Sequence, residues 1–325
     1  MSPVGQRGVA LLVAIILVAI AAVLATAIAF ASAMSARRAS TVFGADQSLL
    51  AAEGAEAMAA YLLTAGGTSS QSQVSLNQPW AQSYGPMQLL PGVTLEFAQL
   101  EDQQGKFNIN DLVSNGTTNR AAVAQFQQLL TLLGIETKWA WLIADWIDAD
   151  NEPNFPDGAE DSVYLSQTPP YRPPNLPVTS ISELLALPGF GRDRYNRLLP
   201  YIAALPPGTT INVCTAPGPV LDALSGKTEY SNIPPQQLLA QRQQEGCFPS
   251  LTAFQSSVST QGTGTTSGTG TSANAGSAVG TSATSQYFRL RSVITIGTAR
   301  FSLYSLLDLE GAGQIHVVLR TFGTE

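Results

Sequence analysis

The densest group of residues that could do chemistry lies between Asp145 and Asp161. This stretch carries seven carboxylates within seventeen residues, at Asp145, Asp148, Asp150, Glu152, Asp157, Glu160 and Asp161. Carboxylates this close repel one another unless water solvates them or they share a cation. Oxygen ligands on a loop shaped by proline and glycine suit Ca²⁺, which takes about six to eight oxygens. The stretch therefore has two interpretations, a calcium site and a solvated acidic loop.

Other chemistry is less well supported. An EF-hand starting at Asp148 would need glycine and glutamate where the chain has Pro153 and Ala159. The same carboxylates could serve as the acid and base of a hydrolase, but acidic pairs in loops are common and catalytic pairs are rare. A Ser-His-Asp triad would have to use His316, which we expect to be exposed on a strand, and no Gly-x-Ser-x-Gly motif is present. We therefore predict that the chain is not an enzyme.

Composition restricts the partners and the compartment. Of the 325 residues only 12% are charged, and the net charge is -7. Nucleic-acid-binding proteins usually carry a basic face, so this balance argues against nucleic acid as a partner. Cys214 and Cys247 are the two cysteines. They predict one disulfide in an exported protein and free thiols in a cytosolic one. Neither belongs to a zinc motif.

The amino-terminal third predicts one long helix that begins in a membrane. Val9–Met34 contains no charged residue and is long enough to span a bilayer, which needs about 20 apolar residues. A cleaved secretory signal would have a shorter apolar region, of about 7–15 residues. Residues 39–63 continue with an amphipathic helical pattern that ends at Gly66 and Gly67.

Strand patterns occur in two groups on either side of a helical block. Val93–Phe97 alternates apolar and polar residues, and Lys106–Asn110 predicts a second strand, whereas residues 66–92 read as a loop. Helical periodicity fills residues 119–251. A Ser, Thr, Gly and Ala segment at 256–285 is predicted to be disordered, because it has too little apolar surface to fold. Three alternating segments after residue 286 predict an antiparallel meander. Since two or three strands alone are marginal, we expect both groups to form one sheet on the amphipathic half of the long helix.

A short motif in the helical block indicates a helix-hairpin-helix. Ser180–Glu183 is a capping box that opens a short helix, and Leu187-Pro-Gly-Phe-Gly191 leads into the next one. Ile211–Ala216 looks like the start of a second hairpin. Such hairpins hold phosphate in DNA-binding proteins, and three arginines are at hand, Arg192, Arg194 and Arg197. A membrane-anchored DNA receptor for DNA uptake is therefore the alternative function, but a packing unit is the favoured interpretation.

The start of the apolar run resembles the leader junction of type IV pilin-like proteins. Gln6-Arg-Gly8 is followed by Val-Ala-Leu-Leu-Val, and in that family a prepilin peptidase cuts after the glycine. The resemblance implies cleavage between Gly8 and Val9. The fifth mature residue is usually glutamate in the family but is Val13 here. In this respect the chain is similar to the K-type minor pseudopilins of type II secretion, which lack that glutamate.

Two further segments resemble the K-type minor pseudopilins. One is Gly105-Lys-Phe-Asn-Ile-Asn-Asp-Leu112, and the other combines Asp145-Trp-Ile-Asp-Ala-Asp150 with Gly158-Ala-Glu-Asp161. Because that family includes calcium binders, the resemblance favours the calcium site over the solvated loop. Asp145 is expected on the helix surface. The ligands that we expect for Ca²⁺ are Asp148, Asp150, Asp157, Glu160 and Asp161.

The resemblance covers nearly the whole chain and implies the same α+β fold. A pilin-like long N-terminal helix packs on an antiparallel sheet, and a large all-α domain of helix-hairpin-helix or SAM-like type is inserted between strands. The expected segments are a prepilin leader at 1–8, the N-terminal helix at 9–65 with its transmembrane part at 9–34, the first part of the β domain at 85–112, the inserted helical domain at 113–255, the disordered linker at 256–285 and the second part of the β domain at 286–325.

The resemblance also implies a function. K-type minor pseudopilins cap the tip of the type II secretion pseudopilus and support protein export across the outer membrane. The implied partners are the I-type and J-type minor pseudopilins, the prepilin peptidase and the inner membrane, with secreted exoproteins as further candidates and no nucleic acid. The implied location is the bacterial inner membrane, crossed once, with the C-terminal domain in the periplasm. Methylation and a Cys214–Cys247 disulfide are expected there.

Overall fold

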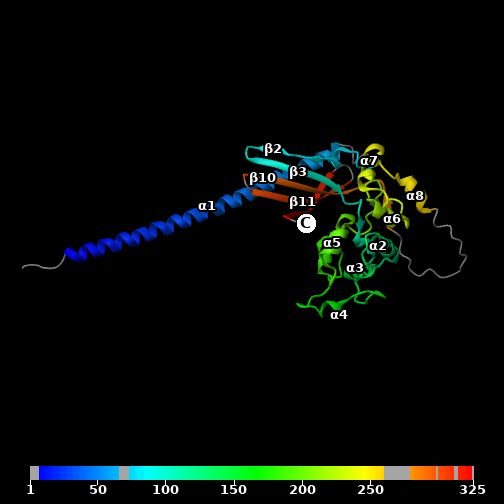
Figure 1. Cartoon of the computed structure of the whole chain (residues 1–325), viewed down its shortest axis with the longest axis horizontal. Helices are drawn as coiled ribbons and strands as arrows, with labels where there is room; N and C mark the ends of the chain where they lie inside the picture. Colours follow the sequence, from blue (N-terminus) through cyan, green and yellow to red (C-terminus); the bar gives the residue numbers. More distant parts are fainter. Residues whose placement is uncertain (1–6, 66–72, 260–278, 298, 311–313, 324–325) are drawn as a thin grey trace, which may run out of the picture.

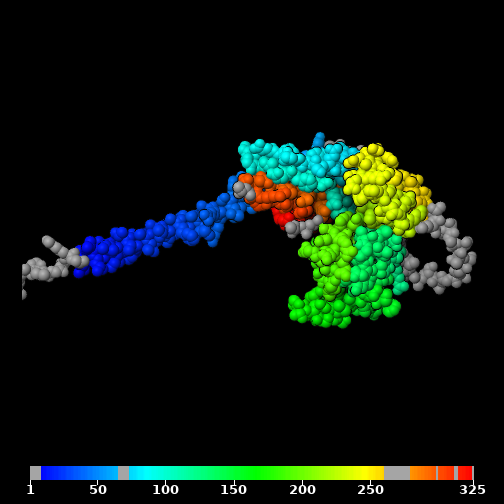
Figure 2. All heavy atoms as spheres, viewed as in Figure 1, coloured from blue at the N-terminus to red at the C-terminus, as the bar shows by residue number. Residues whose placement is uncertain are grey.

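A single helix projects from the body of the protein (Figures 1 and 2). The computed structural model describes all residues except 1–6, 66–72, 260–278, 298, 311–313 and 324–325. The helix, α1 (Arg7–Ala65), has 59 residues, which corresponds to a length of roughly 90 Å. It is the one helix of the described residues that is long and apolar enough to cross a membrane. The predicted long N-terminal helix is therefore confirmed, and most of the predicted leader lies outside the described residues.

The body contains one antiparallel sheet of six strands, which packs against the upper half of α1 (Figure 1). The strand order is β1-β3-β10-β11-β12, and β2 also pairs with β3. The strands are β1 (Ser83–Tyr84), β2 (Met87–Leu90), β3 (Val93–Asp102), β10 (Tyr287–Ile296), β11 (Ala299–Glu310) and β12 (Gln314–Phe322). Strand β3 pairs with β10, so the two groups of strands meet as predicted. The meander β10-β11-β12 is confirmed.

Small residues let α1 lie close to the sheet. Ala52, Ala55, Ala59 and Leu63 recur every three or four residues and are buried, as expected for the inner face of an amphipathic helix. Glu56 is 6% exposed on the same helix. Its carboxylate accepts hydrogen bonds from Arg320 of β12, at 2.8 Å and 2.6 Å, and from Ser305 Oγ of β11 at 2.5 Å. Burial raises the pKa of Glu56, but the bonds from Arg320 and Ser305 and the charge of Arg320 outweigh it and hold the pKa below its usual value.

The chain leaves the sheet after Asp102 and returns at Tyr287, and the intervening residues build a helical domain at the far end of the sheet (Figure 1). Its main helices are α2 (Arg120–Leu132), α3 (Trp139–Ile147), α4 (Asp161–Tyr164), α5 (Gly191–Leu198), α6 (Gly218–Ser225), α7 (Pro235–Glu245) and α8 (Leu251–Ser259). Four short 3-10 segments lie at Pro79–Ala81, Ile109–Leu112, Ile181–Ala186 and Leu199–Tyr201. Three two-stranded pairs complete the described elements: β4 (Phe107–Asn108) with β7 (Ile202–Ala203), β5 (Val113–Ser114) with β6 (Thr117–Thr118), and β8 (Ile211–Asn212) with β9 (Thr281–Ser282).

The helical periodicity gives the domain its core. The predicted apolar face of α2, with Phe126 and Leu130 at its centre, is fully buried. Asn119 caps this helix, since its side chain accepts a hydrogen bond from the N–H of Ala122 at 3.3 Å. The helix ends before Gly134, whose φ of +63° favours glycine. The predicted capping box of Ser180 is present as well.

Two predicted boundaries at the first junction are wrong. Residues 66–92 are not only a loop, because β1 and β2 lie there and extend the sheet beyond β3. The predicted strand Lys106–Asn110 does not join the sheet. Only Phe107 and Asn108 are extended, and they pair in parallel with β7 inside the helical domain. Phe107 is buried in the helical core, so this domain starts well before residue 113.

The predicted disordered linker at 256–285 is wrong at both ends. Helix α8 extends through Ser259. After the segment outside the described residues, β9 pairs in parallel with β8. Ser285 is 9% exposed, and its Oγ donates a hydrogen bond of 2.6 Å to Asp102 at the end of β3. Polar residues in this return segment are thus ordered by partners from other elements.

Candidate functional site

Helix α3 and the loop after it bring three carboxylates together. Asp145 lies in the last turn of α3, Asp148 follows the helix directly, and Glu160 precedes α4. Their exposed fractions are 0%, 1% and 4%. One oxygen atom from each lies within 4.8 Å of the others. We name Asp145, Asp148 and Glu160 the acidic cluster.

Hydrogen bonds satisfy only part of the acidic cluster. The carboxylate of Asp145 accepts bonds from Asn154 Nδ2 at 2.6 Å, Asn154 N at 3.1 Å and Ala159 N at 2.7 Å. Asp148 Oδ2 accepts bonds of 3.1 Å from Thr118 Oγ1 and from Asn154 Nδ2. By contrast, Asp148 Oδ1 and both carboxylate oxygens of Glu160 are buried without a hydrogen-bond partner among the described atoms.

The loop backbone approaches the acidic cluster closely at Gly158. A Cβ atom at this position would overlap the Asp145 carboxylate and the backbone of Asn154. Glycine is therefore the residue that lets the loop fold over the end of α3. Asn154 ties the two parts together, because its side chain donates to both Asp145 and Asp148.

Buried carboxylates without a countercharge hold protons more strongly. Burial and the charge of Asp145 raise the pKa of Asp148 to about 6. Burial and the charges of Asp145, Asp148 and two further aspartates raise the pKa of Glu160 to about 8. Burial also raises the pKa of Asp145, in spite of its hydrogen bonds. A divalent cation at the acidic cluster would replace these protons and supply the missing charge.

The cluster differs in part from the ligand set expected from the sequence. Asp148 and Glu160 come together as expected. Asp145 was predicted on the helix surface, which is wrong, because it is fully buried at the centre of the cluster. Asp150 and Asp157 are exposed. Asp161 lies 3.4 Å from Arg172 in an ion pair. The last three side chains therefore lie outside the cluster, and the role of all these residues as metal ligands stays a prediction.

The helix-hairpin-helix spends its arginines on packing. Arg194 binds the carboxylate of Glu136 with two hydrogen bonds, of 2.7 Å and 2.5 Å. Arg197 Nη1 donates to the carbonyl of Gly134 at 3.1 Å. Only Arg192 of the three stays exposed without a contact of this kind among the described residues. Internal contacts of this kind are what a packing unit requires.

A disulfide joins Cys214 and Cys247, the pair expected in an exported protein. It ties the segment before α6 to the turn after α7. The guanidinium of Arg242, 3% exposed, supports the same junction by donating to the carbonyls of Thr215 at 3.1 Å, Phe248 at 3.0 Å and Ala216. In the chain-entropy model, closing a loop of this length stabilises the fold by about 3–4 kcal/mol.

The outer face of α1 carries a second candidate site. Its residues recur at alternating spacings of four and three, which is the spacing of a helix-packing seam. We call this set the α1 seam: Phe43, Gln47, Leu50, Gly54, Ala57 and Tyr61. Phe43, Leu50 and Tyr61 are 63%, 68% and 68% exposed. A surface helix normally turns a polar face to water, but none of the six positions is charged.

An apolar groove of about 410 Å³ adjoins the α1 seam. Leu50 and Gly54 form one wall, and Leu89 and Leu90 of β2 form the other. Leu90 is 63% exposed. The seam and this groove together give α1 two apolar faces, one packed on its own sheet and one facing outward above the apolar run.

Comparison with known proteins gives consistent results. A family model described as type II secretion system (T2SS), protein K, matches residues 105–207. Type II secretion system protein K of Pseudomonas aeruginosa is 32% identical over 328 residues, covering 98% of this chain and 93% of that protein. The protein of the same name from Klebsiella pneumoniae is 33% identical, with coverage of 98% and 94%.

One solved structure is similar to the present one. It is the crystal structure of the GspK-GspI-GspJ complex from the type 2 secretion system of enterotoxigenic Escherichia coli. The similar chain is 27% identical and superposes with a TM-score of 0.69, covering 89% of this chain and 100% of that chain. The predicted fold class is thereby confirmed for both domains and their connection.

Proposed function

Because this chain belongs to the type II secretion system protein K family, we propose that it caps the tip of the secretion pseudopilus. Its role in the system is that of a minor pseudopilin, which is a structural component. The observation that carries the cap is the position of the helical domain, at the end of the sheet far from the apolar half of α1 (Figure 1). A domain of this bulk blocks the space in which another subunit would stack. The DNA-receptor alternative is not supported.

The partners we propose are the I-type and J-type minor pseudopilins, as in the complex of the similar structure. The α1 seam supports this, since an uncharged face on a long helix is stabilised when another helix covers it. Small residues at Gly54 and Ala57 would let a partner helix approach closely. The adjoining groove offers room for larger side chains of that helix.

We further propose the location and processing of the chain. The single apolar helix suggests a single-pass anchor, and we place it in the bacterial inner membrane with both domains in the periplasm, where Cys214 and Cys247 stay bonded. The prepilin peptidase would cut between Gly8 and Val9, and methylation would follow. Amino-terminal sequencing of the mature protein is expected to begin at Val9. A start at Met1 would contradict this proposal.

The acidic cluster is proposed as a structural calcium site. Asp145, Asp148 and Glu160 supply oxygen ligands, which Ca²⁺ prefers, and the unpartnered oxygens of Asp148 and Glu160 are the ones that lack another way to be stabilised. Bound Ca²⁺ would neutralise the cluster and hold the loop against the end of α3. Asp150, Asp157 and Asp161 would serve this site through their charge rather than as direct ligands.

Co-purification tests the proposed function. The full chain, expressed in membranes with tagged I-type and J-type pseudopilins, is expected to be recovered with them after mild detergent extraction. Leu50→Arg places a charge in the α1 seam and should reduce this recovery at least tenfold. Leu176→Arg is the matched control, because Leu176 is similarly exposed, at 63%, but lies in the helical domain. Equal recovery of both variants would exclude the seam as the contact.

A further inference from the structure

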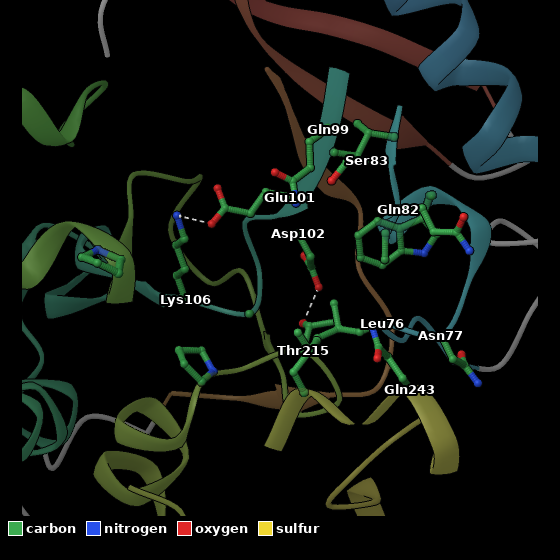
Figure 3. Close-up of a pocket in the computed structure, with 17 residues that line it drawn as sticks. Leu76, Asn77, Gln82, Ser83, Gln99, Glu101, Asp102, Lys106, Thr215 and Gln243 are labelled. Atoms are coloured by element: carbon green, nitrogen blue, oxygen red, sulfur yellow. Dashed lines mark hydrogen bonds and ion pairs between the residues drawn. The ribbon is translucent and has the colours of Figure 1, made fainter. Parts of the chain in front are cut away.

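A cleft of about 870 Å³ opens between the sheet and the helical domain (Figure 3). This volume is in the range of ligand sites, which often lie where domains meet. Its apolar lining includes Leu76, Trp80, Leu100 and Leu239. Side-chain amides at the cleft come from Asn77, Gln82, Gln99 and Gln243. Amides can donate to and accept from a peptide backbone, so the lining suits a polypeptide better than a small ion.

The end of β3 presents an open strand edge to this cleft. Strand β1 pairs only with Gln99 and Ala98 of β3, so Leu100–Asp102 has a strand neighbour on the β10 side alone. The N–H of Gln103 donates to the carbonyl of Tyr287 at 3.0 Å. Backbone groups alternate in direction along an antiparallel strand. The peptide groups of Leu100 and Asp102 therefore point away from β10, toward the cleft.

The walls of the cleft are fixed in place before any ligand arrives. Asp102 accepts hydrogen bonds from Thr215 Oγ1 at 2.5 Å, from Ser285 Oγ at 2.6 Å and from Asn212 Nδ2 at 3.1 Å. These bonds join β3 to the helical domain and to the return segment. A preformed site loses less conformational entropy on binding.

The cleft also has its charges balanced. Glu101 Oε1 lies 3.0 Å from Lys106 Nζ, a contact drawn in Figure 3, and Glu101 Oε2 lies 2.5 Å from Arg289. The lysine is only 5% exposed. A ligand in the cleft therefore meets paired charges and amides, which favours an uncharged extended segment.

We propose that this cleft binds an extended segment of an exported protein, which adds to β3 at Leu100–Asp102 as a short strand. Backbone hydrogen bonds would give affinity, and apolar positions of the cleft would accept alternate side chains. The source follows from position. None of the residues that line the cleft comes from α1, and the cleft is at the end of the sheet remote from the apolar helix (Figure 1). It thus stays open when the α1 seam is covered by an anchored subunit.

The proposal rests on the proposed function and is tested with the assembled complex. The probe is a set of overlapping, fluorescein-labelled twelve-residue peptides that covers one protein whose appearance in the culture medium depends on this chain. Binding is followed by fluorescence anisotropy to the full chain co-purified with its I-type and J-type partners in detergent. At least one peptide is expected to bind. N-methylation of alternate residues in that peptide should weaken binding at least tenfold, because it removes the strand hydrogen bonds.

Two variants localise the binding. Leu239→Trp adds bulk to the cleft at a residue that is 45% exposed, and should weaken binding at least tenfold while leaving partner recovery unchanged. Leu176→Trp, outside the cleft, should bind like the unmodified chain. The proposal is overturned if no peptide binds, if N-methylation has no effect, or if Leu239→Trp binds normally. Failure of the partners to co-purify would instead count against the proposed function.

Discussion

Three buried carboxylates without a countercharge should make stability depend on pH and on calcium. Without a cation, the folded state keeps protons on Asp148, with a pKa of about 6, and on Glu160, with a pKa of about 8. The unfolded chain releases these protons near pH 4. The folded state therefore binds more protons between about pH 4 and pH 8, and its stability falls as pH rises through this window. Thermal unfolding in EDTA from pH 5 to pH 8 measures this loss.

Calcium should reverse the effect where the cluster is ionised. At a concentration 100-fold above Kd, a ligand stabilises by about 2.7 kcal/mol, which corresponds to roughly 5–10 °C in Tm for a domain of this size. We expect this rise at pH 8 and little of it at pH 5. Asp148→Asn should remove the rise, whereas Asp150→Asn, at an exposed residue outside the cluster, should keep it. The same calcium response in both variants would contradict the assigned ligands.

The ion pair of Glu56 with Arg320 gives a second residue-scale prediction. Arg320→Leu leaves the buried Glu56 carboxylate with Ser305 as its remaining partner, and should cost about 2 kcal/mol at pH 7, less than for a fully buried pair because Arg320 is partly exposed. The lowered pKa of Glu56 means that the pair stabilises above the usual value and is lost as pH falls. The deficit of the variant should therefore shrink toward pH 4.

Guanidinium unfolding of the full chain in detergent measures this deficit at both pH values. Arg300→Leu is the control, because Arg300 is an exposed β11 residue without a described ion pair. A deficit of the same size for both variants, or one that does not change with pH, would show that the charge pair is not its cause.

Asp145 and Glu56 show why single buried charges are hard to predict. A carboxylate on a helix usually faces water, which is the basis on which Asp145 was placed on the surface. The available signal was its neighbourhood, since Ile143, Ala144, Trp146 and Ile147 leave α3 no polar face there. For Glu56 no such signal exists in α1, because Arg320 lies on the last strand and only the tertiary fold brings it near.

At the scale of elements, long periodic segments were predictable and short ones were not. Helix α1 and strand β10 bury a repeating face, which leaves a clear pattern in the sequence. Strand β2 has four exposed residues and so lacks alternation. Strand β4 has two residues, and its partner β7 comes far later in the chain. Its pairing depends on the packing of helices between them, which no local pattern encodes.

The return segment before β10 provides an element-scale prediction. Deleting residues 256–285 removes the end of α8, strand β9 and the hydrogen bond from Ser285 to Asp102. Loss of these contacts should lower the Tm by several degrees, although composition alone predicts no change. Replacing only 260–277 with an equal number of glycine and serine residues leaves those contacts in place and should not lower the Tm. An unchanged Tm after the full deletion would refute the structural role of this segment.

At the scale of the whole molecule, the candidate sites are separated along one axis (Figure 1). The α1 seam lies beside the lower part of the sheet, the cleft lies where the sheet meets the helical domain, and the acidic cluster lies beyond it near α4. A subunit that packs along α1 leaves the cleft and the acidic cluster uncovered. Assembly and recognition can therefore occur on one molecule at the same time.

The absence of a carboxylate at Val13 belongs to the same argument about the tip. A carboxylate within the membrane is costly unless it is paired, and in pilin-like subunits the resemblance pairs it with the amino terminus of the subunit above. A subunit at the tip has no neighbour above. Val13 avoids the unpaired charge, while the amino group of Val9 remains available to a glutamate from below. We therefore expect Val13→Glu to be neutral or harmful for assembly, and never required.

Co-purification of the Val13→Glu chain with its I-type and J-type partners measures that effect. Val18→Glu, another exposed position of the same apolar run, is the control for inserting a charge into the membrane. Removal of the corresponding glutamate from the partner directly below should weaken recovery of this chain, because Val9 then loses its counterion. A Val13→Glu chain that assembles better than the unmodified one would place a subunit above it, and the cap would have to be assigned elsewhere.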